Sequence, residues 1–189
     1  KRNFTLHSYG FNLIGNLSTY LDKVIIGALF GYYTLGLYQL GYQFLMFLSI
    51  IPGSLYQYLL PEESSGKNKK DIKLIGLTFA VVIALITFII SPFLIENLFP
   101  AFTDAVPTVR VLSLAVIPST ITAMLNASLL GKGKSRMVFA AGLTYLTSLI
   151  TGLIIIGEIM GVLGLALTLV IAQTIQAMYL CMHKALNEP

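Results

Sequence analysis

Two charged residues, Asp22 and Lys23, interrupt a long apolar stretch of the chain. An ammonium group at such a place can bind an anion, and a carboxylate can be paired, hydrogen-bonded or protonated. Charged side chains at membrane depth cost at least ~2.5–3.5 kcal/mol each on insertion scales, so they seldom persist without a cavity or a partner. Adjacent helical residues point ~100° apart, which favours separate partners for the two side chains. For Lys23 two interpretations stay open: a role in a cavity, or extension of its stem to the outer membrane surface.

Polar residues recur at steps of three and four ahead of this pair, so a helix would place all of them on one face. That face either lines a hydrated cavity or forms hydrogen bonds with neighbouring helices. Weaker signals come from Gln43 in the next apolar run and from Arg110, which either meets an anionic headgroup or snorkels. The candidate substrate-binding residues are Asn12, Asn16, Thr19, Asp22, Lys23, Gln43 and Arg110.

The sequence contains no arrangement typical of an enzyme or a metal site. It has no Walker loop, zincin pair or Ser-His-Asp set, and its two histidines are far apart. Glu62 and Glu63 are the only adjacent acids, and their place in a lysine-rich segment favours a solvated turn. The single cysteine, Cys181, excludes an internal disulfide. We therefore expect no enzymatic activity, no cofactor and no metal.

The composition indicates an integral membrane protein. Of the 189 residues, 56% are hydrophobic and 11% are charged, and the mean hydropathy is +0.83, whereas soluble domains carry about 25% charged residues. The apolar runs are long and continuous, which favours an all-α membrane protein over a membrane barrel. No signal peptide is recognisable. Because the chain starts at Lys1 without a methionine, we expect a processed piece or a fragment.

Six apolar runs are long enough to cross a membrane, since about 20 helical residues span ~30 Å of hydrocarbon. They predict a single six-helix transmembrane lobe over residues 1–189. Several runs exceed the minimum length, so we expect tilts or kinks, with Pro52, Pro92 and Pro118 as natural kink points. The predicted spans are about 4–30, 33–60, 72–97, 107–130, 137–157 and 161–182.

The charges of the connecting segments predict an orientation. With the first residue inside, ten of the twelve basic residues fall on one side of the membrane. The opposite connections hold Glu96, Asp104 and Glu158. The positive-inside rule then places both termini in the cytoplasm, for a multi-pass protein of the cytoplasmic membrane. A nucleic-acid partner is not expected, because the basic residues do not share a folded soluble face.

Short sequence motifs that follow one another along almost the whole chain resemble those of a known family. They are Asp22–Gly27, Phe30-Gly31, Leu35–Tyr38, Leu59-Leu60-Pro61 with Ser64 and Ser65, Leu98–Pro100, Ala105–Pro107, Val111–Leu114, Leu129–Lys134 and Gly161–Ala166. In this order they resemble the Wzx-like polysaccharide (O-antigen) flippases of the multidrug/oligosaccharidyl-lipid/polysaccharide exporter superfamily. The motifs of the fourth to sixth predicted spans are more similar to the C-terminal lobe of these proteins than to the N-terminal one.

The resemblance implies a MATE-like fold, in which two six-helix lobes face each other across a cavity. A missing N-terminal lobe of the same protein would complete this chain, or two copies would associate. The implied function is to flip a polyprenyl-diphosphate-linked oligosaccharide across the cytoplasmic membrane for polysaccharide export. Lys23 first, and then Arg110, would hold the diphosphate. The groups that would bond to the sugars are Asn12, Asn16, Thr19 and Gln43.

Two other functions stay open. A multidrug or cation antiporter of the same superfamily would need an acidic cavity. Asp22 is the only acid away from the span ends, and Lys23 beside it favours anionic substrates. A non-transport subunit of a membrane assembly would tolerate the loss of both charges. The expected partners are lipid-linked oligosaccharide and membrane lipid.

Overall fold

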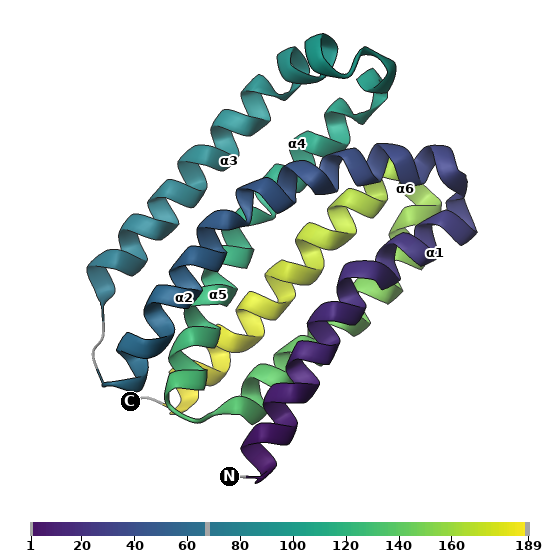
Figure 1. Ribbon diagram of the computed structural model, residues 1–189. Coiled ribbons are helices and arrows are strands. Elements are labelled where there is room, and N and C mark those ends of the chain that lie inside the picture. The colour runs from purple at the N-terminus through teal and green to yellow at the C-terminus, as the bar shows by residue number, and fades with distance from the viewer. Residues whose placement is uncertain (1, 67–68, 188–189) are drawn as a thin grey trace.

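The computed structural model describes the backbone of residues 2–66 and 69–187, and the side chains of residues 20–66 and 69–184. Within these ranges the chain is helical apart from short connections, and no strand occurs (Figure 1). The predicted all-α class is therefore confirmed. The elements are α1 (Arg2–Leu48), α2 (Ile50–Ser64), α3 (Lys70–Leu98), the 3₁₀ helix η1 (Pro100–Ala105), α4 (Val106–Leu114), α5 (Val116–Gly131) and α6 (Ser135–Asn187).

The two longest helices, α1 and α6, each reverse direction at one glycine. Gly31 has φ 81° and ψ 169°, and Gly161 has φ 58° and ψ −140°. Residues with a Cβ atom rarely adopt either conformation, so glycine is what allows these corners. Each of the two helices is thus a pair of antiparallel legs, seen in Figure 1 as a sharp corner in α1 and another in α6.

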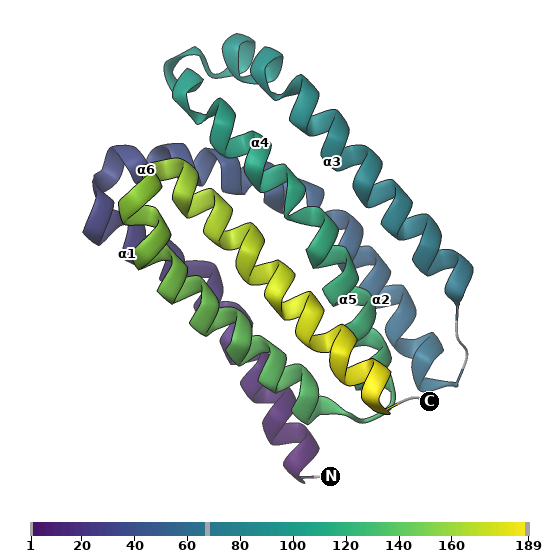
Figure 2. The ribbon, with the colours of Figure 1, turned by 180° about the vertical axis from the view of Figure 1, so that it is seen from behind.

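Proline accounts for the two places where a helix is interrupted without reversing. A proline has no backbone N–H, so it leaves the carbonyl four residues earlier without its helical partner. Pro52 follows the break at Ser49 between α1 and α2, and Pro118 follows the break at Ala115 between α4 and α5. At the second break the Ala115 N–H bonds to the Leu112 carbonyl at 3.0 Å, a tighter 3₁₀ contact. Figure 2 shows that α5 continues roughly along the line of α4.

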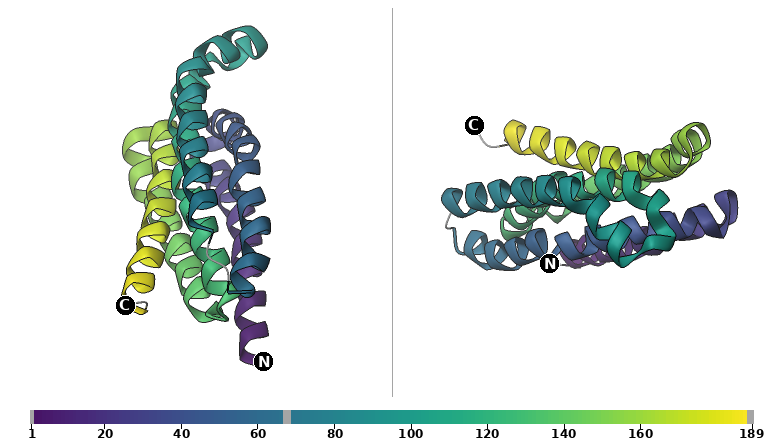
Figure 3. Two further views of the ribbon diagram at one scale, coloured as in Figure 1. Left: turned by 90° about the vertical axis from the view of Figure 1, so that its left-hand side faces the viewer. Right: turned by 90° about the horizontal axis from the view of Figure 1, so that it is seen from above.

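The helices pack into a bundle whose main core lies among α1, α4 and α6. α1 packs against α6 and α4, α2 packs against α5, and α3 packs against α4 and α5. Figure 3 shows the helices running in roughly one direction, with the end of α3 and η1 projecting beyond the rest. The buried centre includes Ile26, Tyr38, Leu112, Ala115, Leu149, Leu153, Leu165 and Leu169.

The two ends of the bundle differ in charge. The start of α1, the end of α2, the start of α3, the α5 to α6 turn and the end of α6 all lie at one end, and the two glycine corners and η1 lie at the other (Figures 1 and 3). The first end carries lysines and one arginine on the connecting segments, whereas the second carries Asp104 and Glu158. The described basic residues at the first end are Lys69, Lys70, Lys73, Lys132, Lys134, Arg136 and Lys184.

The exposed face of α3 is apolar over about the length needed to cross a membrane. α3 exposes a stripe of large apolar side chains from Leu74 to Phe93, including Phe79 and Ile89. An exposed apolar stripe of this length indicates contact with lipid. Within the described residues, four helical stretches are long and apolar enough to cross a bilayer: Tyr20–Ser64, Lys70–Leu98, Pro100–Gly131 and Ser135–Lys184.

Candidate functional site

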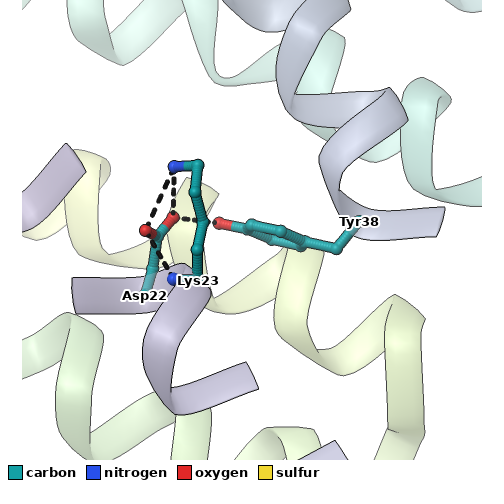
Figure 4. Close-up of polar contacts among 3 residues, drawn as sticks. All are labelled: Asp22, Lys23 and Tyr38. Carbon is teal, nitrogen blue, oxygen red and sulfur yellow. Dashed lines mark hydrogen bonds and ion pairs between the residues drawn. The ribbon is translucent and has the colours of Figure 1, made fainter. Parts of the chain in front are cut away.

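A buried carboxylate, that of Asp22, lies at the centre of a polar cluster in the described part of α1. Asp22 is 1% exposed, and both of its carboxylate oxygens are engaged. The ammonium group of Lys23 lies 3.2 Å from Oδ1, and the hydroxyl of Tyr38 donates to Oδ2 at 2.9 Å. Figure 4 shows the three side chains converging from the two legs of α1. The sequence alone left the state of Asp22 open, and the structure shows it ion-paired and hydrogen-bonded.

The ammonium group of Lys23 is held between a carboxylate and an aromatic face. Its Nζ lies 3.6 Å from the centroid of the Tyr42 ring, a cation–π contact, while it also meets Asp22. The Tyr42 ring is in turn stacked on the Tyr38 ring, with the centroids 6.2 Å apart. The Lys23 side chain is only 19% exposed. The two adjacent charges are thus paired with each other, and each also has a separate aromatic partner, Tyr38 for Asp22 and Tyr42 for Lys23.

The corner at Gly31 brings this cluster together. Asp22 lies nine residues before Gly31 and Tyr38 lies seven residues after it, so antiparallel legs place the two side by side. Tyr42 follows Tyr38 by one helical turn on the same face. The tyrosines therefore complete a site of which the sequence analysis named only the charged half.

The arrangement presents one ammonium group whose anion in this structure is the Asp22 carboxylate. The negative charge of Asp22 compensates the positive charge of Lys23, and the Tyr38 hydroxyl donates a hydrogen bond to the carboxylate. An ion pair with little solvent contact is stable only while both partners stay matched.

Among the predicted site residues with described side chains, Gln43 and Arg110 form no hydrogen bond or ion pair with this cluster. Gln43 follows Tyr42 on the second leg of α1 and is exposed. The three predicted residues on the first leg, Asn12, Asn16 and Thr19, lie in the helical backbone of α1 but outside the residues whose side chains the structure describes.

Arg110 has a structural partner elsewhere in the bundle. Its Nε donates to the Phe88 carbonyl at 3.2 Å, and its guanidinium lies 5.4 Å from the Phe88 ring. That carbonyl is the one that Pro92, four residues later in α3, leaves without a helical donor. The Ser91 hydroxyl donates to the same oxygen at 3.1 Å. Arg110 thus satisfies a backbone group that an apolar surrounding would penalise.

A second buried carboxylate corrects the expectation of a solvated turn at Glu62 and Glu63. Helix α2 continues to Ser64, so Glu63 stays on its inner face and is buried. Lys73 of α3 donates to Glu63 Oε1, and the Ser128 hydroxyl of α5 donates to Oε2 at 3.2 Å. Glu62 is half-buried, with one carboxylate oxygen 3.8 Å from Lys69 Nζ. Glu63 therefore connects the end of α2 with α3 and α5 through these two contacts.

Two polar residues of α5, Thr122 and Asn126, are also buried, and the sequence analysis passed over both. They are 9% and 6% exposed, and they line a shallow groove between α2 and α5. The signal was available in part, because a threonine and an asparagine four residues apart share one face of a helix. What the sequence did not contain was the position of α2 opposite them.

One comparison with known proteins identifies a relationship. Residues 2–103, just over half of the chain, match a protein family described as polysaccharide biosynthesis protein. The matched part contains Asp22, Lys23, Tyr38 and Tyr42. No curated protein and no solved structure matches the chain.

Proposed function

This chain belongs to the family of polysaccharide biosynthesis proteins, and from that membership we propose that it is part of a flippase for lipid-linked sugars. The substrate is a polyprenyl-diphosphate-linked oligosaccharide, and the step is its movement across the cytoplasmic membrane for polysaccharide export. The barrier is the cost of taking a diphosphate and sugar hydroxyls through hydrocarbon. A polar path along protein removes that cost while the polyprenyl tail stays in lipid.

The observation that carries the proposal is the low-exposure ammonium group of Lys23 on an apolar helix. It lies between the Asp22 carboxylate and the Tyr42 ring, which fix its position. In this proposal the substrate's diphosphate takes the place of the carboxylate beside it. A lysine needed only as an anchor would extend its stem toward water. A lysine that is held in place by an ion pair with a carboxylate of the protein is suited to bind a diphosphate in place of that carboxylate.

The arrangement of legs supports a transporter lobe with six membrane crossings and a MATE-like fold. The glycine corners divide α1 and α6, and the remaining legs come from α2 with the second half of α1, from α3, and from α4 with α5. The start of α1, the end of α6 and the basic residues next to the helix ends there share one end of the bundle, which supports cytoplasmic termini. A second lobe of the same protein, or a second copy, would close the cavity on the exposed face of this one.

The charge pattern favours this substrate over the alternatives. A cation antiporter needs an acid open to its substrate, whereas both oxygens of Asp22 are already occupied by Lys23 and Tyr38. An enzyme would need reactive groups gathered at a membrane face, whereas Glu63 is bound to Lys73 and Ser128. We therefore propose a transport role without a catalytic step.

The test is transfer of labelled lipid-linked oligosaccharide across proteoliposome membranes, with the full-length protein. Lys23→Ala removes the anion-binding group, so transfer is expected to fall at least tenfold while the protein remains folded. Asp22→Asn tests the exchange partner and is expected to lower transfer as well. Lys70→Ala, which removes an exposed lysine at the start of α3, is the matched control and should transfer normally.

Two results would contradict the proposal. Normal transfer by both Lys23→Ala and Asp22→Asn would remove this pair from the mechanism and leave Lys23 as an anchor at the membrane surface. Absence of transfer by the wild type, together with efflux of organic cations, would establish an antiporter instead.

A further inference from the structure

The same short sequence pattern occurs at both places where a helix breaks without reversing. Residues 48–54 read LSIIPGS and residues 114–120 read LAVIPST, with leucine, isoleucine and proline at the same positions. In both copies the break lies three residues before the proline, at Ser49 before Pro52 and at Ala115 before Pro118. Each proline lacks the N–H that would bond to the leucine carbonyl four residues earlier. Helical hydrogen bonds therefore do not fix the bend at either break.

The two breaks lie beside a small groove. On one side of the breaks the second leg of α1 packs against α4, where a Cβ atom added at Gly41 would lie 3.0 Å from Thr108. On the other side α2 packs against α5. The groove between α2 and α5 has a volume of about 310 Å³, and its walls include Pro52 and Gly53 of one helix and Ser119 of the other. The space next to the breaks leaves room for the two bends to change.

Beyond the breaks, α2 and α5 are joined to each other at their far ends. The Ser128 hydroxyl donates to Glu63 Oε2 at 3.2 Å, and a Cβ atom added at Gly131 would lie 3.0 Å from the Glu63 Cβ. The packing of α2 against α5 is also the most extensive between two helices in the described part of the chain. Lys73 donates to Glu63 as well, which ties the start of α3 to the same place. The two helices therefore form one arm, and any bend at one break has to be matched at the other.

We propose that the two breaks are a paired hinge, about which α2 and α5 bend together relative to the rest of the bundle. Helix α2 has 15 residues, which gives an arm of ~22 Å at ~1.5 Å per residue. A change of ~15° at the base of such an arm moves its far end by about 6 Å. That end lies with the start of α1 and the end of α6, so the movement widens or narrows this end of the bundle (Figure 1). The hinge does not depend on which substrate the protein carries.

The test measures distances between pairs of spin labels by double electron–electron resonance, on the full-length protein in lipid nanodiscs with all other cysteines replaced. One pair joins Ser64→Cys at the end of α2 to the native Cys181 of α6, which is exposed. The other pair joins Ser64→Cys to Lys132→Cys, directly after α5, in a Cys181→Ala background. The first distance is expected to spread over about 6 Å more than the second, because the arm moves against α6 while its two helices stay together.

The prolines provide the matched substitutions. Pro52→Ala together with Pro118→Ala returns an N–H to each break, so the spread of the first distance should fall to that of the second. Pro92→Ala is the control and should leave the spread unchanged. The carbonyl that Pro92 leaves without a helical donor is already bonded to Arg110, and α3 is continuous through this proline.

Two results would overturn the paired hinge. Equal spreads of the two distances in the wild type would mean that α2 and α5 do not move as one arm. An unchanged spread in the double proline variant would place the movement elsewhere in the chain. Both distances are measured without any transfer of lipid-linked oligosaccharide. A failed hinge therefore leaves the proposed function standing, and a failed transfer assay leaves the hinge.

Discussion

At the scale of single residues, the pairing of Asp22 with Lys23 explains how two charges persist in an apolar helix. Each charge reduces the cost of burying the other, and Tyr38 and Tyr42 supply a hydroxyl donor and an aromatic face. The two members are not equivalent. Asp22 is almost fully buried, whereas Lys23 retains some contact with solvent. Loss of the lysine should therefore harm the fold more than loss of the aspartate.

Lys23→Met is expected to destabilise the protein by about 3 kcal/mol, because it leaves a buried carboxylate without its cation. Asp22→Asn should cost about 1–2 kcal/mol, since the ammonium group keeps the Tyr42 ring and some water. The double variant should be more stable than Lys23→Met alone. Thermal unfolding in detergent would measure all three, and strictly additive losses would contradict the pairing.

Arg110 offers a second prediction at the residue scale. Arg110→Ala removes one of two donors from the Phe88 carbonyl, with an expected cost of about 1 kcal/mol. Pro92→Ala returns a backbone N–H to that carbonyl, so the double variant should recover most of the loss. Thermal unfolding of the four proteins in the cycle measures the coupling. If Pro92→Ala gives no recovery, Arg110 does not act through this carbonyl.

At the scale of elements, the two glycine corners determine which residues of a long helix meet. The leg before Gly31 carries the charges and the leg after it carries the tyrosines, so the site exists only because α1 folds back. The backbone at Gly31 lies in a region that is nearly exclusive to glycine. A residue with a side chain there would strain the corner or move the legs.

Gly31→Ala is expected to cost about 1–3 kcal/mol and to separate Tyr38 from Asp22. Gly36→Ala is the matched control, because Gly36 is helical and a Cβ atom there makes only an ordinary contact with Phe102 at 3.7 Å. That control should be neutral or more stable by about 0.5–1 kcal/mol. The comparison is made by thermal unfolding and by transfer of lipid-linked oligosaccharide. Equal stability of the two variants would contradict the strained corner.

At the scale of the whole molecule, the unequal charge of the two ends predicts an orientation that can be tested directly. In a Cys181→Ala background, a membrane-impermeant maleimide should label Glu158→Cys in intact cells. Lys132→Cys should be labelled only after the membrane is opened, because the lysine-rich turns are expected in the cytoplasm. The reverse pattern of labelling would invert the topology.

The sequence was sufficient for the all-α class of the fold, and it drew attention to the two charged residues that the structure pairs in one cluster. Long apolar runs predicted helices, and the cost of burying charge drew attention to Asp22 and Lys23. It did not reveal Tyr38, Tyr42 or the groove at Asn126, because these depend on which legs lie side by side. Glu63 was misjudged for a related reason: its local segment is rich in lysine, but its partners come from α3 and α5.

The close spacing of the charged site in the chain has a consequence for biogenesis. Asp22 and its hydroxyl partner are sixteen residues apart, and Lys23 is adjacent, so the cluster forms within one helical hairpin. Such a hairpin can enter the bilayer from the translocon as a unit, before the rest of the chain has been synthesised. The most costly side chains would then reach hydrocarbon already neutralised by each other, and insertion would not have to wait for the later helices.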